Sequence, residues 1–331
     1  MRKTDLARKY RQQYGAKMPT LKLARIMYKE NNLLFKDVED ARSSLRYIEG
    51  KQGVKDKKHI LKNNSEFIVK ENRPYNPYNL PESDAESFEP YHIKGHKRGL
   101  IIGDIHLPYQ NNEAITACLN YAKKQSIDFI LINGDLCDFH QLSYFMKDPR
   151  KKRFSEELQI MTDFFAVLKK TFKCKIYFKF GNHEERYESF LYQKAHELIG
   201  VDDFSLETIV KKRVHDIEVI RDKRLVVING LPIIHGHEFG RGVFNPVNAS
   251  RGLFLQAKHS CVKGDCHTTS EHTEPDIYRK IMTTFSVGCL CGLTPKWLPL
   301  NKWNHGFAII DLIGDNEYNF RNYRIYEGKV L

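Results

Sequence analysis

The sequence predicts an α/β fold, a layered sandwich of β-sheets flanked by helices, with a small basic α-helical module at the N-terminus. Two observations predict the sandwich: from Lys97 onward short apolar runs alternate with helical patterns, and after about residue 223 strand-like runs dominate. The charge distribution predicts the separate module. Residues 1–60 hold sixteen Lys and Arg against seven Asp and Glu, which is +9 of the chain's net +12.

The N-terminal module, residues 1–60, is predicted to contain two helices joined by a tight turn. Residues 20–31 carry apolar side chains near helical spacing, with Thr20 available as an N-cap. Residues 37–49 repeat that spacing and stop at Gly50, a residue type that commonly follows a helix. The pair is compatible with a helix-turn-helix that binds nucleic acid, or with a basic hairpin that packs on the rest of the chain. In a helix-turn-helix, the second helix would present Arg42, Ser43, Arg46 and Lys51.

A linker is predicted over residues 61–96. Its centre, residues 72–90, holds four prolines and an acidic patch and shows no apolar periodicity. The remaining residues, 97–331, are expected to form one large domain with a sizeable core.

Composition argues against a membrane or secreted protein. The longest apolar runs, such as 128–133 and 224–234, are shorter than the roughly 20 residues that a membrane-spanning helix needs. The N-terminus runs from Met1 into charged and polar residues, unlike a secretory signal. The seven cysteines are odd in number and scattered, unlike a disulfide framework. We therefore expect reduced cysteines, a cytoplasmic location and no membrane contact.

The large domain is predicted to begin with strands and helices in alternation. Strands are expected over 99–103, 128–133 and 174–180, with helices over 111–125 and 155–171 between them. The second half is predicted to be mostly strands, over residues 225–229, 232–235, 261–264, 283–288 and 306–312.

Polar clusters follow the apolar strands of this domain. The first three read GDIH at 103–106, GDLCD at 134–138 and GNHE at 181–184, and each begins with a glycine that allows a sharp turn. Two later strands end in HGH at 235–237 and GDCH at 264–267. Because ligands bind beyond the carboxyl ends of strands in α/β sheets, the clusters could meet at one edge. Carboxylate, imidazole and amide oxygen together suit a divalent transition metal, and a carboxylate can bridge two ions.

These motifs, in this order, resemble those of the calcineurin-like metallophosphoesterase superfamily over residues 98–312. The family's motifs are GDxH, GDxxD, GNH[DE], a strand ending in His before Gly, and GHxH. The resemblance implies a metallophosphoesterase-type layered sandwich of two mixed β-sheets flanked by helices, with residues 97–331 as the catalytic domain. It also implies hydrolysis of phosphate esters at a centre of two divalent metal ions that activate a water molecule.

The resemblance also implies a role for each matching residue. His183 is similar to the family's catalytic histidine, which sits beside the leaving group and donates or orients a proton. Asp138 is similar to the carboxylate that pairs with that histidine and fixes its tautomer; alternatively, Asp138 only caps the following loop. The implied metal ligands form two sets that share one bridging carboxylate: Asp104, His106, Asp135 and His267 for one ion, and Asp135, Asn182, His235 and Asp265 for the other.

One of these positions departs from the family pattern. GHxH has become GDCH, so Asp265 stands where a histidine is usual. A carboxylate still binds metal but is a harder ligand, so Mn²⁺ is the favoured metal, with Fe²⁺ and Zn²⁺ as alternatives. Otherwise the second site is weakened, and His237, His259 or His272 compensates.

The superfamily includes nucleases, protein phosphatases and small-molecule phosphodiesterases, and the fold alone does not choose among them. Protein Ser/Thr phosphatases follow GDxxD with an arginine that grips phosphate, whereas Phe139 follows it here; Arg186 or Arg241 could replace that arginine. The basic module favours a polyanion, so we expect phosphodiester hydrolysis in DNA or RNA by a nuclease or phosphodiesterase. The alternatives are a phosphomonoesterase or cyclic-nucleotide phosphodiesterase acting on a small molecule, a phosphoprotein phosphatase, and a catalytically silent scaffold.

Overall fold

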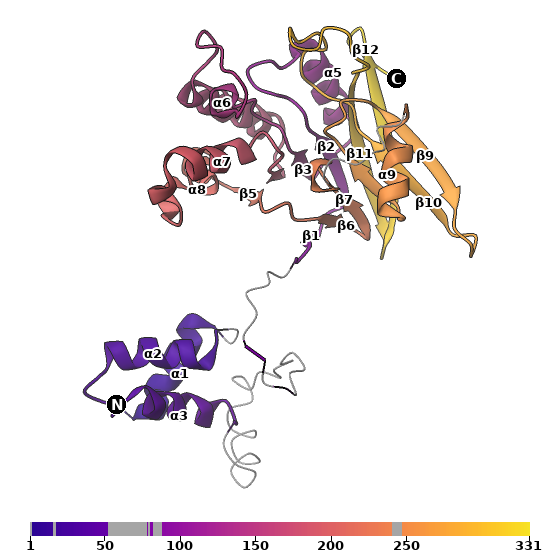
Figure 1. Cartoon of the computed structure of the whole chain (residues 1–331). Coiled ribbons are helices and arrows are strands. Elements are labelled where there is room, and N and C mark those ends of the chain that lie inside the picture. The colour runs from indigo at the N-terminus through magenta and orange to yellow at the C-terminus, as the bar shows by residue number, and fades with distance from the viewer. Residues whose placement is uncertain (1, 16–17, 52–77, 79, 82–87, 240–246) are drawn as a thin grey trace. The chain divides into compact units, whose positions relative to one another are not determined.

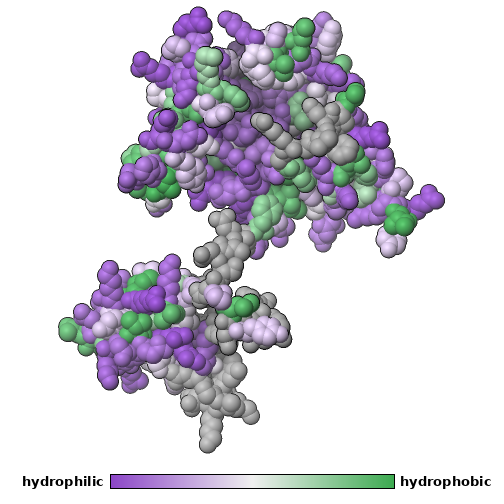
Figure 2. All heavy atoms as spheres, in the orientation of Figure 1, coloured by the Kyte–Doolittle hydropathy of each residue, from purple (hydrophilic) through white to green (hydrophobic). Residues whose placement is uncertain are grey.

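The computed structural model describes residues 2–15, 18–51, 78, 80–81, 88–239 and 247–331 (Figure 1). The chain divides into two compact units, residues 1–85 and 86–331. Most of the expected linker, 61–96, lies outside the described residues. None of the helices in the described ranges has the length and apolar character of a membrane span. The face of each unit seen in Figure 2 is largely hydrophilic, with scattered hydrophobic residues.

The N-terminal unit is built from helices α1 (Lys3–Tyr14), α2 (Thr20–Glu30) and α3 (Val38–Ile48). Helices α2 and α3 match the expected ones, whereas α1 was missed because most of its residues are charged or polar. The helices share an apolar core that includes Leu6, Leu23, Met27, Leu45 and Ile48.

A buried ion pair between Arg11 of α1 and Glu49 at the end of α3 lies beside this core. Thr20, expected as an N-cap, instead donates its hydroxyl to Glu49 at 2.8 Å, and Pro19 precedes the helix. The N-cap of α3 is Asp37, whose carboxylate accepts from the amide of Asp40 at 2.8 Å. The ion pair joins α1 to the end of α3.

The large unit contains two mixed sheets among its described residues, as expected from the family resemblance. One has the strand order β13-β12-β11-β2-β3-β4-β5, in which β2 to β5 are parallel. The other has the order β1-β6-β7-β8-β10-β9. The bounds of the first sheet are β2 (Arg98–Ile102), β3 (Phe129–Asn133), β4 (Lys175–Lys179), β5 (Ile217–Ile220), β11 (His305–Gly314), β12 (Glu317–Tyr326) and β13 (Lys329–Val330). Those of the second are β1 (Tyr91–Ile93), β6 (Val226–Ile228), β7 (Leu231–Ile233), β8 (Cys261–Lys263), β9 (Ser270–Pro275) and β10 (Ile281–Ser286).

Side-chain alternation along the strands produces the layers. In β2, Leu100 and Ile102 join the core beneath the helices, whereas Ile101 joins the core between the two sheets. Helix α9 (Ala249–Ala257) packs on the outer face of the second sheet, where Leu253 is buried. The helices over the first sheet are α5 (Asn112–Lys123), α6 (Phe154–Thr171), α7 (Glu185–Lys194) and α8 (Leu206–Arg213).

Strand β1 lies within the range expected to be linker, but it belongs to the large unit. It pairs in parallel with β6, and Ile93 is buried between the sheets. The guanidinium of Arg224 lies 5.2 Å from the ring centroid of Tyr91. A strand this short leaves no periodic signal in the sequence. The expectation of reduced cysteines is confirmed, because none of the seven forms a disulfide and all lie in described residues.

Candidate metal centre

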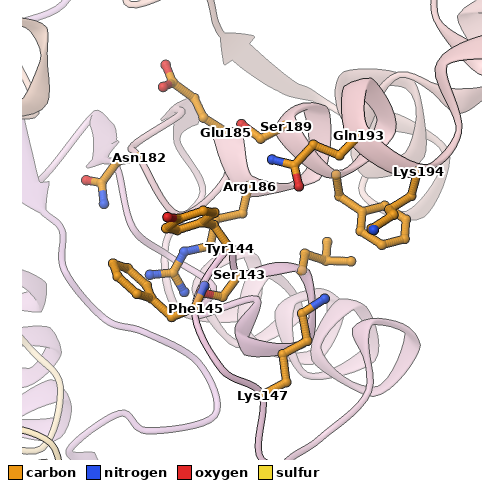
Figure 3. Close-up of a pocket in the computed structure, with 12 residues that line it drawn as sticks. Ser143, Tyr144, Phe145, Lys147, Asn182, Glu185, Arg186, Ser189, Gln193 and Lys194 are labelled. Carbon is orange, nitrogen blue, oxygen red and sulfur yellow. The ribbon is translucent and has the colours of Figure 1, made fainter.

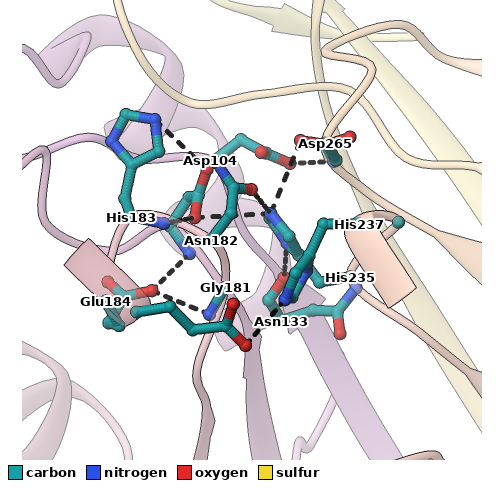
Figure 4. A network of polar contacts seen from close by, with 12 residues as sticks. Asp104, Asn133, Gly181, Asn182, His183, Glu184, His235, His237 and Asp265 are labelled. Carbon is teal, nitrogen blue, oxygen red and sulfur yellow. Dashed lines mark hydrogen bonds and ion pairs between the residues drawn. The ribbon is translucent and has the colours of Figure 1, made fainter. Parts of the chain in front are cut away.

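The five polar clusters predicted from the sequence come together at one edge of the sandwich (Figure 4). Strands β2, β3 and β4 are parallel, so the loops that follow them emerge on the same side. Strands β7 and β8 are parallel in the other sheet and deliver the last two clusters to the same place. The parallel strand ends therefore position the site.

Asp135 lies at the centre of the site and is buried. Its Oδ1 lies 3.3 Å from Nε2 of His235, and its Oδ2 lies 3.8 Å from Nε2 of His106. Oδ1 also accepts from the amide of His183 at 2.9 Å, which fixes the carboxylate in place. The two oxygens of one carboxylate thus face two different groups of side chains.

The first group contains Asp104, His106 and His267, all buried. Nε2 of His267 lies 3.2 Å from Oδ1 of Asp104 and 3.1 Å from Nε2 of His106. Burial alone would lower the pKa of His267, but the charge of Asp104 raises it to about 10. Cys291, which was not among the predicted ligands, also reaches this group, with its Sγ 3.9 Å from Nδ1 of His267.

The second group contains Asn182, His235 and Asp265. Nε2 of His235 lies 3.1 Å from Oδ1 of Asn182 and 3.8 Å from Oδ1 of Asp265. On the other side of the ring, Nδ1 donates to the carbonyl oxygen of Asn133 at 2.7 Å, which leaves Nε2 as the lone-pair nitrogen. Asp265 is the most open member, with its side chain 38% exposed.

The composition of the two groups fits a metal. Their converging atoms are carboxylate, amide and thiol side-chain atoms and imidazole nitrogens, which suit a divalent metal. Among the described residues three clusters could hold an ion, and none of them includes Asp265: His106, His267 and Cys291; His106, Asp135 and His183; and Asp104, Asp135 and His235. Oδ1 of Asp104 is buried, and no well-aligned hydrogen bond reaches it from the described residues; Nε2 of His267, at 3.2 Å, is its close polar neighbour. A buried carboxylate oxygen without a donor is costly unless a cation completes it.

The backbone around the site is strained and crowded. Five of the residues described above have φ between +50° and +59°, a region that residues other than glycine rarely adopt. Gly181 leaves space that a side chain would fill, because a Cβ there would lie 2.2 Å from Oδ1 of Asp135 and 2.9 Å from Nε2 of His235. The strained residues are Asp104, His106, Asp135, Asp265 and His267.

His183 and Asp138 lie on the open side of the two groups. Nδ1 of His183 donates to the backbone oxygen of Asp138 at 2.9 Å, and the Asp138 carboxylate lies 3.4 Å away. The same carboxylate lies 3.5 Å from Nδ1 of His106. The tautomer of His183 is therefore fixed mainly by a backbone carbonyl. Arg186 donates to that carbonyl at 2.6 Å and to Nε2 of His183 at 2.9 Å.

Glu184 supports the site and was not singled out from the sequence, although it ends the GNHE motif. It is buried and accepts from the amides of Asp135, Cys137 and Gly181 at 2.9 to 3.0 Å. Burial and the charge of Asp135 raise the pKa of Glu184 to about 7. One carboxylate thus ties the loop after β3 to the loop after β4.

Of the other candidate histidines, His237 packs against the second group, with its ring centroid 5.3 Å from that of His235, but each of the three has a partner of its own. His237 pairs with Glu185 at 3.0 Å, and His272 pairs with Glu274 at 2.8 Å. His259 contacts the carbonyl of its neighbour Ser260. Among the described residues, these contacts do not support the alternative that His237, His259 or His272 takes the place of Asp265 as a metal ligand. Arg241 lies outside the described residues.

Comparison with known proteins identifies the family. The model of the calcineurin-like phosphoesterase family matches residues 98–289, which is more than half of the chain. The chain belongs to this family. It is therefore a metal-dependent hydrolase that acts on phosphate esters, as the motifs predicted.

Individual relatives of this phosphoesterase are distant. The gene 54 protein of Mycobacterium phage L5 is 22% identical over 235 residues, which cover 66% of this chain and 91% of the phage protein. Vps29 of Entamoeba histolytica in complex with zinc aligns at 14% identity with a TM-score of 0.38, over 71% of this chain and 96% of Vps29. A cold-active protein tyrosine phosphatase aligns at 16% identity with a TM-score of 0.36, over 78% and 86%.

Proposed function

We propose that this phosphoesterase hydrolyses phosphodiester bonds, in nucleic acid above all, at a dinuclear metal centre. The observation that carries the proposal is the position of Asp135. Its two oxygens face His235 on one side and His106 on the other, at 3.3 and 3.8 Å. A carboxylate that faces two groups of ligand atoms is suited to bridge two ions.

The proposed ligands are those that the motifs predicted. Two divalent ions held there would activate a water molecule and neutralise the charge of the phosphate oxygens. The oxygen-rich second group, with Asp265 in place of a histidine, favours Mn²⁺. The first ion would be held by Asp104, His106, Asp135 and His267, and the second by Asp135, Asn182, His235 and Asp265.

The proton for the leaving group is proposed to come from His183. Its Nε2 lies 3.7 Å from Oδ2 of Asp135 and so points toward the reacting centre. Burial alone would lower the pKa of His183, but the negative charges of Asp135 and Asp138 have the larger effect and raise it. Because Nδ1 donates to the carbonyl of Asp138, Nε2 is the nitrogen that would carry a proton to a departing alkoxide, once Arg186 no longer donates to it. Arg186, which donates to Nε2 here, would turn its guanidinium to the phosphate when substrate binds.

The residue after the GDxxD motif argues against a phosphoprotein phosphatase. Phe139 is buried, and its ring packs 5.1 Å from that of Phe154, so no cation reaches phosphate from this position. A small-molecule phosphomonoesterase or cyclic-nucleotide phosphodiesterase remains the second candidate, because the metal centre suits those esters too.

The basic helices favour the nucleic-acid substrate. Of the side chains expected to contact it, Arg46 is exposed and makes no ion pair among the described residues. Arg42 pairs with Glu39, and Lys51 pairs with Glu49, each at 2.8 Å. Helix α2 instead presents exposed cations at spacings of three and four residues, which lie on one helix face and make no ion pair among the described residues. They are Lys22, Arg25 and Lys29. This face is the proposed contact for nucleic-acid phosphates.

Three variants test the proposal, with Mn²⁺ added and bis(p-nitrophenyl) phosphate, p-nitrophenyl phosphate and DNA as substrates. Asp135→Asn should lose both metals and hydrolysis. His183→Ala should keep both metals and lose hydrolysis, whereas His196→Ala, on an exposed surface, should behave as the intact protein. Preference for the monoester over both diesters would reject the proposed substrate. Full turnover by His183→Ala would reject the assigned proton donor.

A further inference from the structure

A cleft of about 250 Å³ adjoins the metal centre (Figure 3). One wall is the segment after residue 142, and the other is helix α7 with the loop before it. Asn182, a proposed metal ligand, and Arg186, which contacts His183, both line it. Figure 3 shows Arg186 beside Tyr144 and Phe145, with Lys147 and Lys194 farther from Asn182. The cleft therefore leads away from the position proposed for the scissile phosphate.

The cleft has an unusually exposed aromatic wall. Of the residues that line it, Tyr144 is 82% exposed and Phe145 is 66% exposed; Met146, the next residue in the chain, does not line the cleft and is 94% exposed. The rings of Tyr144 and Phe145 lie edge to face with their centroids 5.4 Å apart. Three consecutive large apolar side chains on the surface are costly unless they serve binding.

The same segment is strongly basic. Residues 144–153 contain five Lys and Arg against one Asp, a net charge of +4. Arg150 is held by Asp148 at 2.8 Å, but Lys147 and Lys194 make no ion pair within the part of the chain that the structure describes. Lys147 lies 5.7 Å from the ring centroid of Phe190, so it stays inside the cleft. The cleft thus combines flat aromatic faces with two lysines that make no ion pair there, and its one acidic lining residue is Glu185.

We propose that this cleft binds single-stranded nucleic acid, and that it holds the nucleotide next to the phosphodiester at the metal centre. The inference rests on the proposed function and names its substrate class. Tyr144 and Phe145 would stack on an unpaired base, while Lys147 and Lys194 bind the next phosphate. Aromatic rings tolerate any base, so the cleft selects single strands and not a sequence. In a duplex, the bases already stack on one another and cannot enter.

A phosphopeptide is the competing occupant, since cations also bind phosphorylated side chains. The aromatic pair favours nucleic acid, because a phosphoserine peptide has no planar base for the rings to cover. A labelled single-stranded oligonucleotide should therefore be competed with unlabelled oligonucleotide and, separately, with a phosphoserine peptide.

The test measures binding of fluorescein-labelled tetrathymidylate by anisotropy, using the full chain with His183→Ala so that the probe is not cleaved. Tyr144→Ala and Phe145→Ala should each weaken binding about 5- to 150-fold. Lys147→Ala should weaken binding and reduce its dependence on salt. Tyr278→Ala is the matched control: this tyrosine is 88% exposed in the turn between β9 and β10, and its removal should leave the affinity unchanged.

Each alternative result overturns the inference. Unchanged affinity after both aromatic substitutions, in protein with intact circular dichroism, would mean that the cleft does not stack bases. The inference would also be wrong if Tyr278→Ala lost as much affinity for tetrathymidylate as the two aromatic variants, or if those variants lost as much affinity for a short duplex. Stronger competition by a phosphoserine peptide than by unlabelled tetrathymidylate would contradict it too. Hydrolysis of bis(p-nitrophenyl) phosphate by the intact protein, measured separately, reports on the proposed function. Absent hydrolysis would reject that function whatever the binding result.

Discussion

Substituting Gly181 by alanine tests whether the ligand atoms need the space that this glycine leaves. The added Cβ would lie 2.2 Å from Oδ1 of Asp135, 2.6 Å from its amide nitrogen and 2.9 Å from Nε2 of His235. All three distances are shorter than the contacts that Cβ atoms normally make. The methyl group must therefore push the bridging carboxylate or the imidazole out of position.

The expected size of the effect follows from these contacts. Overpacking of a fixed site costs about 1–3 kcal/mol, which corresponds to about a 5- to 150-fold loss of metal affinity. Titration calorimetry with Mn²⁺ measures that affinity, and hydrolysis of bis(p-nitrophenyl) phosphate should fall with it. The backbone of Gly181 does not require glycine, since its φ is outside the left-handed region, so the cost comes from the added methyl group alone.

Gly292→Ala is the matched control for this change. A Cβ on Gly292 would meet only the carbonyl oxygen of Tyr109 at 3.6 Å, an ordinary contact. Its metal affinity and turnover should equal those of the intact protein. If Gly181→Ala bound two ions as tightly as the control, the proposed positions of Asp135 and His235 around the metals would be wrong.

Three further predictions follow from other parts of the molecule. The carboxylate of Glu157 accepts from the amide of Phe139 at 2.5 Å, and burial raises the pKa of Glu157 to about 7. As the pH rises through 4.5, the unfolded state therefore loses this proton while the folded state keeps it. Glu157 should therefore lower stability by up to about 3 kcal/mol between about pH 4.5 and 7, and Glu184 should act in the same direction. In urea titrations with EDTA present, Glu157→Gln should show a shallower fall than the intact protein; the same slope in the variant would exclude a contribution from Glu157. Asp265→His should shift the preferred activator from Mn²⁺ toward Zn²⁺, and an unchanged preference would indicate that Asp265 does not touch a metal. Replacing Lys22, Arg25 and Lys29 with glutamate should weaken duplex DNA binding and flatten its log-log salt dependence by about 0.9 per lost contact, whereas Lys173→Glu in the large unit should not.

The sequence predicted which polar clusters come together because its signals are local. Each cluster follows an apolar strand and begins with glycine or histidine, so a short window contains both the strand and the ligands. The parallel order of β2, β3 and β4 then brings Asp104, Asp135 and Asn182 to the same edge. The types of side chain proposed to bind metal could therefore be inferred from the motifs alone, before any interatomic distance was known.

The contacts that the sequence could not predict are non-local. Cys291 reaches His267 because the chain returns past Asp104, whose carbonyl accepts from the amide of Leu290 at 3.1 Å. Arg11 and Glu49 are far apart in the sequence, and nothing in either helix signals their pairing. The polar edge strand β9 lacks the apolar alternation that marks a half-buried strand.

The apolar pattern of the sequence also does not show which apolar side chains are exposed. Tyr144, Phe145 and Met146 form an apolar run that resembles part of a strand, yet all three are exposed, and Tyr144 and Phe145 line the cleft beside the metal centre. The flanking 3-10 helix His140–Leu142 and the loop after it keep this run out of the core. The cleft therefore became apparent only from the three-dimensional arrangement.

The most direct test of the dinuclear centre is anomalous X-ray diffraction from crystals of the protein grown with Mn²⁺. We expect two anomalous peaks roughly 3.5–4 Å apart, on either side of the Asp135 carboxylate. His106 should border one peak and His235 the other. A single peak, or two peaks that do not share Asp135, would contradict the account.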